Sequence, residues 1–350
     1  MESLVSAVVS EVHLALLLVI FAGSIAVLVK GAGILVDEAV ALSVGWGMSK
    51  MLVGATIVSL GTTLPETAVS VFAAVRGSPG LALGNAVGSI IADTGLILGL
   101  AVLVGPIPVD RKVVRRQSWI QFASAVLLVL VCIPLAAPRD VFTVGGRLPR
   151  FVGIVFLVLL VVYIWQSVRW SRASGAPSVH PEALDSARNE KPAIALVKLA
   201  LGIALVVIAS QVLIPTVEET AHRLRIPDAI IAATLVAFGT SLPELVTAIT
   251  AVRKRHGELA LGNIIGADIL NVLFVTGASA AATPAGLAVP PQFFLLYFPS
   301  LLFVVTVLRI GISRSNHELR RGFGVVLLGA YVVTVLAGYL VPGMDAAGGP

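Results

Sequence analysis

Charged residues are scarce in this sequence, making up only 12% of its 350 residues. A soluble domain carries roughly 25% charged residues, which its surface needs to stay in water. Hydrophobic residues make up 57% of the chain, and its mean hydropathy is +1.01. They run in blocks of about 20, the length that spans a bilayer core of roughly 30 Å. The composition therefore predicts an integral protein of a lipid bilayer.

Cysteine and histidine are also scarce, which excludes several kinds of chemistry. The single cysteine, Cys132, cannot form an intrachain disulfide or a thiolate metal site. No HExxH motif or Ser/His pairing is evident, so we do not expect an enzyme. The basic residues stand in short clusters between the apolar blocks, so a pI of 9.7 does not indicate a nucleic-acid partner. No obligate protein partner is evident.

The apolar blocks predict ten transmembrane helices. The segment before the first block is acidic (Glu2, Glu11), so this block is interpreted as a helix and not as a cleaved leader. The predicted spans are residues 13–30, 51–75, 81–104, 118–137, 151–170, 193–215, 229–252, 258–280, 289–309 and 322–341.

Lysine and arginine are distributed unevenly over the segments between these spans. With both termini outside, 18 of the 24 basic residues face the cytoplasm and 6 face outward. Cytoplasmic segments are enriched in Lys and Arg, so we expect this orientation in the plasma membrane. The polar stretch 171–192 is predicted to be a cytoplasmic linker between residues 1–170 and residues 193–350, with five spans in each half.

The two halves contain an internal repeat. Residues 54–99 and 232–277 align without a gap at an offset of 178, with 17 of 46 positions identical. Because five is an odd number, the second copy enters the membrane from the opposite side. The predicted fold is therefore an all-α membrane protein of ten transmembrane helices in two inverted five-helix repeats. Such repeats are typical of transporters that work by alternating access.

Each repeat places a glutamate, Glu66 or Glu244, near the middle of an apolar span. A charge there costs roughly 2.5–3.5 kcal/mol on insertion scales, so intramembrane acids are functional candidates by default. Pro65 and Pro243 precede the glutamates and cannot donate to the carbonyls of Gly61 and Gly239. Such carbonyls are tolerated at membrane depth where they face protein, water or an ion.

Further oxygen-bearing side chains accompany the two glutamates. Helical spacing predicts that Ser59, Thr62, Thr63 and Glu66 share one face. No thiolate or imidazole accompanies these oxygens, so hard cations fit best, Ca²⁺ above all and Na⁺ beside it. Asp268 has no acidic counterpart, and both a place near the site and a pairing elsewhere are open. The corresponding positions of the second repeat are Ala237, Thr240, Ser241 and Glu244, and the next helices add Ser89, Asp93, Ala267 and Asn271.

The motifs GTTLPE and GTSLPE, followed by GNAVGS and GNIIGA, resemble the two α-repeats of the cation/Ca²⁺ exchanger superfamily, in its Na⁺/Ca²⁺ exchanger-like branch. The resemblance implies that Glu66 and Glu244 are the central Ca²⁺ ligands. It implies that helices 1 and 6 slide to gate the site. It also implies that Thr62, Thr63, Thr240 and Ser241, with carbonyls near Ser59 and Ala237, complete the Ca²⁺ and Na⁺ sites, and that Ser89, Asp93 and Asn271 line the same cavity.

The sequence departs from the prokaryotic pattern of this branch in two ways. The family amide and acid are exchanged at Asp93 and Asn271, which leaves the formal charge of the cavity unchanged, and Ala267 replaces a serine. The expected function is a Ca²⁺/Na⁺ antiporter in calcium homeostasis, with no cofactor. A Ca²⁺/H⁺ or K⁺-dependent exchanger on the same fold is the nearest alternative, and an intramembrane enzyme or a channel is more distant.

Overall fold

The computed structural model describes residues 12–134, 138–173, 192–223, 241–315 and 317–340. Its elements are almost entirely helical, as the long apolar blocks predict. In the first half they are α2 (Leu14–Gly45), α3 (Lys50–Val53), η1 (Gly54–Val58), α4 (Ser59–Thr62), α5 (Leu64–Val75), α6 (Pro79–Ile91), η2 (Ala92–Ile97), α7 (Leu98–Val104), β1 (Ile107–Pro108), α8 (Arg111–Cys132), η3 (Asp140–Phe142), β2 (Gly146–Leu148) and α9 (Arg150–Ala173).

The second half follows the same plan. Helices α14 and α15 begin 178 residues after α5 and α6, at the offset of the sequence repeat. Its elements are α11 (Pro192–Arg223), α14 (Leu242–Arg253), α15 (Gly257–Leu270), η5 (Asn271–Thr276), α16 (Gly277–Ala282), β3 (Leu287–Val289), η6 (Phe293–Tyr297), α17 (Phe298–Arg314), β4 (Glu318–Leu319) and α18 (Arg321–Leu340).

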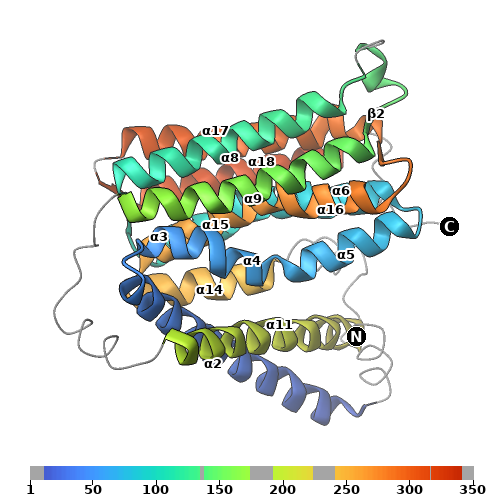
Figure 1. The fold of residues 1–350 in the computed structure, drawn as a ribbon. Helices are drawn as coiled ribbons and strands as arrows, with labels where there is room; N and C mark the ends of the chain where they lie inside the picture. Colours follow the sequence, from blue (N-terminus) through green and yellow to red (C-terminus); the bar gives the residue numbers. More distant parts are fainter. Residues whose placement is uncertain (1–11, 135–137, 174–191, 224–240, 316, 341–350) are drawn as a thin grey trace.

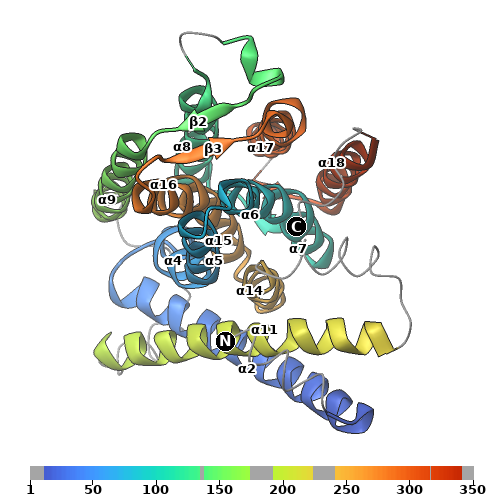
Figure 2. The same cartoon turned by 90° about the vertical axis from the view of Figure 1, so that its right-hand side faces the viewer.

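The helices form one bundle flanked by a crossed pair. Most helices run in roughly the same direction, with α8, α9 and α17 on one side and α2 and α11 on the other (Figure 1). Turned by 90°, α2 and α11 cross beneath the bundle (Figure 2). Two short antiparallel pairs, β1 with β4 and β2 with β3, join connections from the two halves. The broken segments α4–α5 and α14–α16 lie between these layers.

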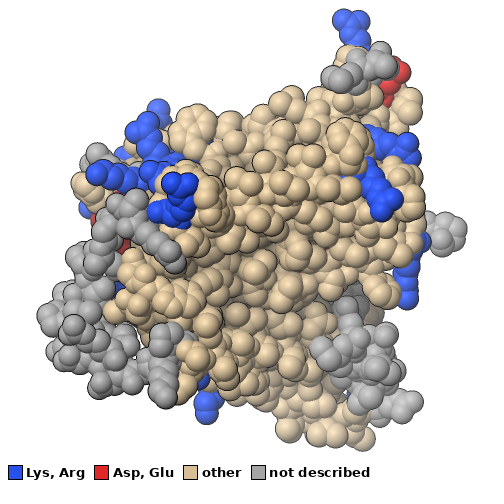
Figure 3. Space-filling model, in the orientation of Figure 1, with Lys and Arg blue, Asp and Glu red and all other residues tan. Residues whose placement is uncertain are grey.

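The surface has the charge distribution of a membrane protein. Most visible Lys and Arg side chains lie toward the two ends of the bundle, and the face between them is almost free of charge (Figure 3). Among the described residues, six helices are long and apolar enough to cross a bilayer, and the bent pair Lys50–Thr62 and Leu64–Val75 makes a seventh. The predicted span 229–252 lies partly outside the described residues, so the count of ten remains a prediction.

The first helix is longer than predicted. The predicted span ended at Lys30, but α2 continues to Gly45. An exposed lysine does not end a helix, because its long aliphatic stem can carry the ammonium group away from the apolar surface. Asp37 and Glu38 consequently lie within α2 and not beside it, where Asp37 pairs with Lys254 at 2.6 Å and Glu38 with Lys198 at 3.7 Å.

Helices α2 and α11 approach each other closely at two glycines. A Cβ atom on Gly31 would lie 2.8 Å from Cβ of Leu205, and one on Gly202 would lie 2.7 Å from the backbone nitrogen of Leu35. Small residues at such crossings let helix backbones come into contact without a large side chain between them. The crossing therefore depends on the absence of side chains at these positions.

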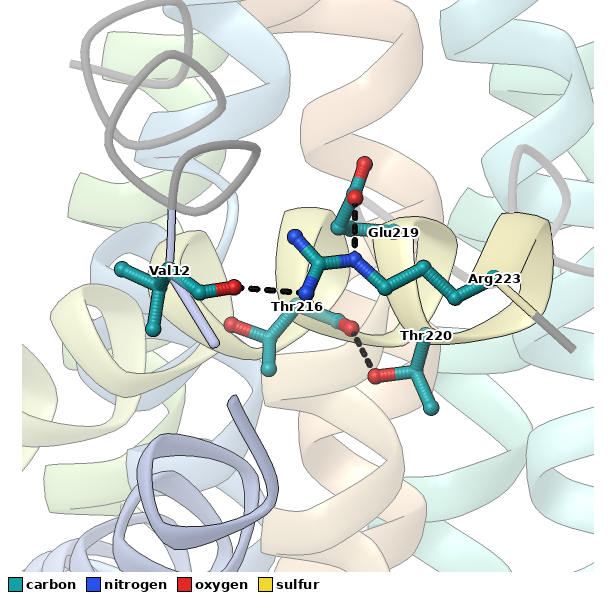
Figure 4. Close-up of polar contacts among 5 residues, drawn as sticks. All are labelled: Val12, Thr216, Glu219, Thr220 and Arg223. Atoms are coloured by element: carbon teal, nitrogen blue, oxygen red, sulfur yellow. Dashed lines mark hydrogen bonds and ion pairs between the residues drawn. The ribbon is translucent and has the colours of Figure 1, made fainter. Parts of the chain in front are cut away.

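The far end of this pair is held by polar contacts (Figure 4). Arg223 near the end of α11 pairs with Glu219 at 2.6 Å and donates from Nη1 to the carbonyl of Val12 at 2.5 Å. Thr216 and Thr220 each donate to a carbonyl one turn earlier in α11. The segment before α2 is thus tied to the last turn of α11.

Candidate functional site

Two glutamates lie at the starts of two half-helices. Helix α4 ends at Thr62 and α5 begins at Leu64, with a bend of 46° between the two segments. Pro65 cannot donate a backbone hydrogen bond to the preceding turn, which explains the break. Glu66 stands in the first turn of α5, and its side chain is 1% exposed. The positive end of a helix dipole favours a carboxylate at this position.

The second repeat builds the same arrangement with α14. This helix begins at Leu242, Pro243 follows, and Glu244 stands in the first turn with 1% exposure. Ser241 is its N-cap residue and is also buried. Ala237 and Thr240 were predicted to belong to this half of the site, and both lie outside the described residues.

The break corrects one detail of the predicted geometry. The spacing of Ser59, Thr62, Thr63 and Glu66 predicted one continuous helix face, but Glu66 lies on a separate helix beyond the bend. All four side chains are nevertheless buried. A proline two residues after Thr63 makes the bend predictable, whereas its direction depends on the surrounding helices.

Two π-helical segments carry the next pair of predicted residues. Asp93 is the second residue of η2, and Asn271 is the first residue of η5, so both repeats widen at corresponding places. Single π-helical turns within α-helices often occur at functional sites. Asp93 and Asn271 are each 1% exposed, and Ser89 is buried one turn earlier on α6.

The carboxyl groups of the two repeats lie close enough to act on one another electrostatically. Glu244 interacts with both Glu66 and Asp93, and Glu66 interacts with Asp93. Polar side chains also meet across the halves, with Thr62 beside Glu244 and Ser241 beside Asp93. The structure therefore brings these five residues of the predicted site together.

Several buried oxygen atoms in this region have no hydrogen-bond partner among the described residues. Burying a polar atom without a partner costs free energy that a bound cation would offset. In the described part of the chain, no three carboxylate, imidazole or thiolate groups converge on one metal position. Hydroxyl, amide and backbone oxygens would therefore have to complete a coordination shell, which suits Ca²⁺ and Na⁺. The unpartnered atoms are Thr63 Oγ1, Glu66 Oε2, Asp93 Oδ1, Glu244 Oε2 and Asn271 Oδ1.

Asparagines bridge the broken helices to their neighbours. Asn85 on α6 donates to the carbonyl of Glu66 at 3.3 Å and to Oγ of Ser70 at 3.0 Å. Asn263 on α15 accepts from Thr62 at 3.5 Å. Both asparagines therefore join a segment of the broken helix to a neighbouring helix.

Two glycines of the second repeat lie against the backbone of the first half. A Cβ on Gly262 would lie 2.1 Å from the carbonyl oxygen of Met51, and one on Gly266 would lie 2.5 Å from Cα of Ala55. These two glycines therefore allow α15 to pack closely against α3 and η1. The corresponding partners of Gly84 and Gly88 in the first repeat, residues 229 and 233, lie outside the described residues.

The sequence-based prediction missed Gln121, a buried polar side chain that contacts Asp268 beside the site. Asp268 on α15 accepts hydrogen bonds from Thr94 of η2 and Gln121 of α8, and its carboxyl interacts electrostatically with Asp93. Of the two possibilities left open for Asp268, the structure shows a place beside the site. A glutamine inside an apolar span was the signal that could have pointed to Gln121.

Comparison with known proteins gives consistent matches. The family described as "Sodium/calcium exchanger protein" matches residues 16–169 and 194–340. The inner membrane protein YrbG of Escherichia coli (strain K12) is 33% identical over 293 residues, which cover 82% of this chain and 86% of YrbG. The sodium/calcium exchanger MaX1 of Methanosarcina acetivorans is 31% identical over 330 residues, which cover 87% of this chain and 93% of MaX1.

Solved structures of the sodium-calcium exchanger NCX_Mj have the same fold. The form soaked with zero Na⁺ and Ca²⁺ superposes with a TM-score of 0.76 at 25% identity, covering 93% of this chain and 99% of that one. The form soaked with 2.5 mM Na⁺ and 0.1 mM Ca²⁺ gives a TM-score of 0.74 over 92% of this chain and 98% of that one, also at 25% identity.

Proposed function

Because the chain belongs to the sodium/calcium exchanger family, we propose that it is a secondary active antiporter that exchanges Ca²⁺ for Na⁺ across the membrane. Such exchange would contribute to cellular calcium homeostasis. The observation that carries the proposal is the pair of buried carboxylates, Glu66 and Glu244, which lie within electrostatic range of each other at the starts of two half-helices.

Coupling follows from the charge of the site. One Ca²⁺ neutralises the Glu66 and Glu244 carboxylates, and so do several Na⁺ ions. An unneutralised anionic pocket is expensive to enclose in an apolar environment, so only a loaded site crosses readily between the two gates. Ions on the two sides of the membrane therefore exchange and do not leak.

The proposed ligand set joins both repeats. Glu66 and Glu244 hold Ca²⁺ centrally, and the crossed pair α2 and α11 slides over the site to open it to alternate sides. The other proposed oxygen ligands of the cations are Ser59, Thr62, Thr63, Ser89, Asp93, Ala237 (through its carbonyl), Thr240, Ser241 and Asn271.

The proposed topology places the chain in the cell membrane with both termini outside. It consists of inverted repeats at residues 1–170 and 193–350, joined by a cytoplasmic linker at residues 171–192. The excess of Lys and Arg in the segments assigned to the cytoplasm, 18 of 24, supports this orientation. Modification of single introduced cysteines from either side of the membrane, in a Cys132→Ala background, would test it.

Transport in proteoliposomes tests the function directly. We expect purified protein to take up ⁴⁵Ca²⁺ when Na⁺ is loaded inside, and Glu66→Gln and Glu244→Gln each to abolish the uptake. Thr334→Val is a suitable control, because Thr334 bonds only within α18 to the carbonyl of Ala330 among the contacts described. Normal uptake by either glutamine variant would refute the assignment.

Separate gradients identify the counter-ion. Uptake that follows the Na⁺ gradient and ignores imposed K⁺ and H⁺ gradients supports Na⁺/Ca²⁺ exchange. Uptake driven by the pH gradient alone, or dependent on K⁺, would identify the alternative exchangers of this fold. Flux that ignores every counter-ion gradient would identify a channel.

A further inference from the structure

A second polar cluster lies beside the Glu66–Glu244 site. Asp268 on α15 accepts hydrogen bonds through Oδ2 from Thr94 Oγ1 and from Gln121 Nε2. Gln121 also donates to Thr94 Oγ1 at 3.3 Å. Three separate elements, η2, α8 and α15, thus converge on one carboxyl group in the interior of the bundle.

This cluster contains oxygen atoms whose bonding capacity is not used. Oδ1 of Asp268 and Oε1 of Gln121 are both buried and have no hydrogen-bond partner among the described residues, and the same holds for Oδ1 of Asp93. The side chains of Asp268, Gln121 and Asp93 are each 1% exposed. Leaving three such acceptors unsatisfied is costly, and a single cation among them would remove the cost.

The negative charge of the four buried acids also calls for a bound cation. Asp268 interacts electrostatically with Asp93, which in turn interacts with Glu66 and Glu244. In the described part of the chain, no Lys, Arg or His forms an ion pair with any of these four acids. One Ca²⁺ neutralises two carboxylates, so further positive charge has to enter when the other two are ionised.

We propose that Asp268, Asp93, Thr94 and Gln121 form a binding site for one monovalent cation of the Na⁺ class, next to the Glu66–Glu244 site. The donor set is one carboxylate of its own, one shared with the central site, a hydroxyl and an amide oxygen. All are hard oxygen ligands, whereas Ca²⁺ takes 6–8 oxygens and several carboxylates. This inference rests on the proposed function, because it assigns one of the exchanged Na⁺ ions to a particular place.

The consequence is a cation that binds beside the Ca²⁺ ligands without replacing them. A Na⁺ ion at Asp268 would offset the negative charge of Asp93, so the central site would experience less negative charge from that carboxylate. Removing this site should therefore weaken Na⁺ coupling more than it weakens Ca²⁺ binding. The two effects can be measured separately in one preparation.

The test compares Na⁺-driven ⁴⁵Ca²⁺ uptake with Ca²⁺/Ca²⁺ exchange in proteoliposomes. For Asp268→Asn we expect the Hill coefficient for Na⁺ to fall by about one, and Na⁺-driven uptake to fall at least several-fold more than Ca²⁺/Ca²⁺ exchange. Gln121→Leu should shift the Na⁺ dependence in the same direction, and it keeps the test open if Asp268→Asn does not fold. Thr334→Val serves as the control.

Each outcome decides the proposal. An unchanged Na⁺ Hill coefficient in both folded variants overturns it. A change confined to the pH dependence of uptake overturns it in favour of a proton at Asp268. Failure of the unmodified protein to exchange Ca²⁺ at all refutes the proposed function, which distinguishes that failure from loss of the Na⁺ site alone.

Discussion

The side chain of Asn85 donates a hydrogen bond to the backbone carbonyl of Glu66, with 3.3 Å between Nδ2 and the oxygen. The same amide group reaches Oγ of Ser70 at 3.0 Å. Asn85 therefore fixes the first turn of α5 against α6 at the residue that carries the candidate Ca²⁺ ligand. This contact gives Asn85 a positioning role, because its amide holds the backbone of Glu66.

Replacing this asparagine should weaken Ca²⁺ binding without abolishing it. Asn85→Leu leaves the Glu66 carbonyl without this donor, and an unsatisfied buried group costs about 1–3 kcal/mol. We expect the Ca²⁺ concentration for half-maximal uptake to rise roughly tenfold, since 1.4 kcal/mol corresponds to a factor of ten. Asn85→Gln, which keeps the amide, should lose less, and equal effects from both variants would contradict the positional role.

The crossing of α2 and α11 should tolerate no added side chain at Gly202. A Cβ there would lie 2.7 Å from the backbone nitrogen of Leu35, so Gly202→Ala must push the helices apart. Overpacking of this kind costs about 1–3 kcal/mol. We expect a lower melting temperature in detergent and slower transport. Gly329→Ala is the matched control, because a Cβ at Gly329 meets nothing within 4 Å among the described residues. Similar losses in both variants would refute the packing argument.

Tyr163 supports the irregular helix that precedes the site. Its hydroxyl lies 3.1 Å from the carbonyl of Ala55 in η1 and 3.0 Å from Oε1 of Gln117. Tyr163→Phe removes a donor from these buried acceptors and should cost about 1–3 kcal/mol of stability. Thermal unfolding in detergent would measure it. A melting temperature equal to that of the unmodified protein would show that another group satisfies Ala55.

His256 should make the protein less stable in acid. Burial lowers the pKa of this imidazole, as do the nearby ammonium groups of Lys50 and Lys254, while Asp37 opposes them. Nδ1 of His256 lies 3.3 Å from Nζ of Lys50. As the pH falls through about 6.5, the unfolded chain binds a proton that the folded chain does not, so the free energy of unfolding decreases.

Replacing the imidazole should remove this part of the acid sensitivity. We expect the melting temperature of the unmodified protein to fall between pH 7.5 and pH 5.5, and that of His256→Gln to fall less. His13→Gln is the control, since His13 is exposed at the start of α2 and its side chain makes no capping bond. Equal acid sensitivity in the unmodified protein and His256→Gln would exclude the histidine as the cause.

Calcium should stabilise the protein through the two glutamates. A ligand that binds only the folded state raises stability by about 2.7 kcal/mol at 100 times its Kd. We expect Ca²⁺ to raise the melting temperature and a chelator to reverse the rise. Glu66→Gln should respond weakly or not at all, whereas Asn85→Gln should still respond. A full Ca²⁺ response in Glu66→Gln would place the ion elsewhere.

Much of the candidate site was predictable because it depends on local sequence. Pro65 and Pro243 interrupt hydrogen bonding within their own helices, so the half-helix starts at Glu66 and Glu244 follow from the chain itself. The constant offset of 178 residues also predicted that α5 and α14 would match. Oxygen-bearing side chains in apolar spans had to be buried together, because the bilayer offers them no water.

Other features depended on neighbours that are distant in the sequence. The length of α2 was underestimated because the exposed position of Lys30 is set by the packing of the helix. Gly262 and Gly266 pack against the backbone of Met51 and Ala55, which lie in the other half of the chain. The carboxyl of Asp268 accepts a hydrogen bond from Gln121, 147 positions away, and no local sequence pattern predicts that contact.

The sequence by itself determined that this protein lies in a membrane, that its two halves share a plan, and that a pair of acids is buried in broken helices. These properties follow from hydropathy, repetition and the missing N–H of proline, which act within a few residues. Only the tertiary structure decided which oxygens meet across the halves. It also decided that Asp268 stands beside Asp93 and the two glutamates. Such contacts depend on how whole helices are oriented, and that is settled by the packing of all of them together.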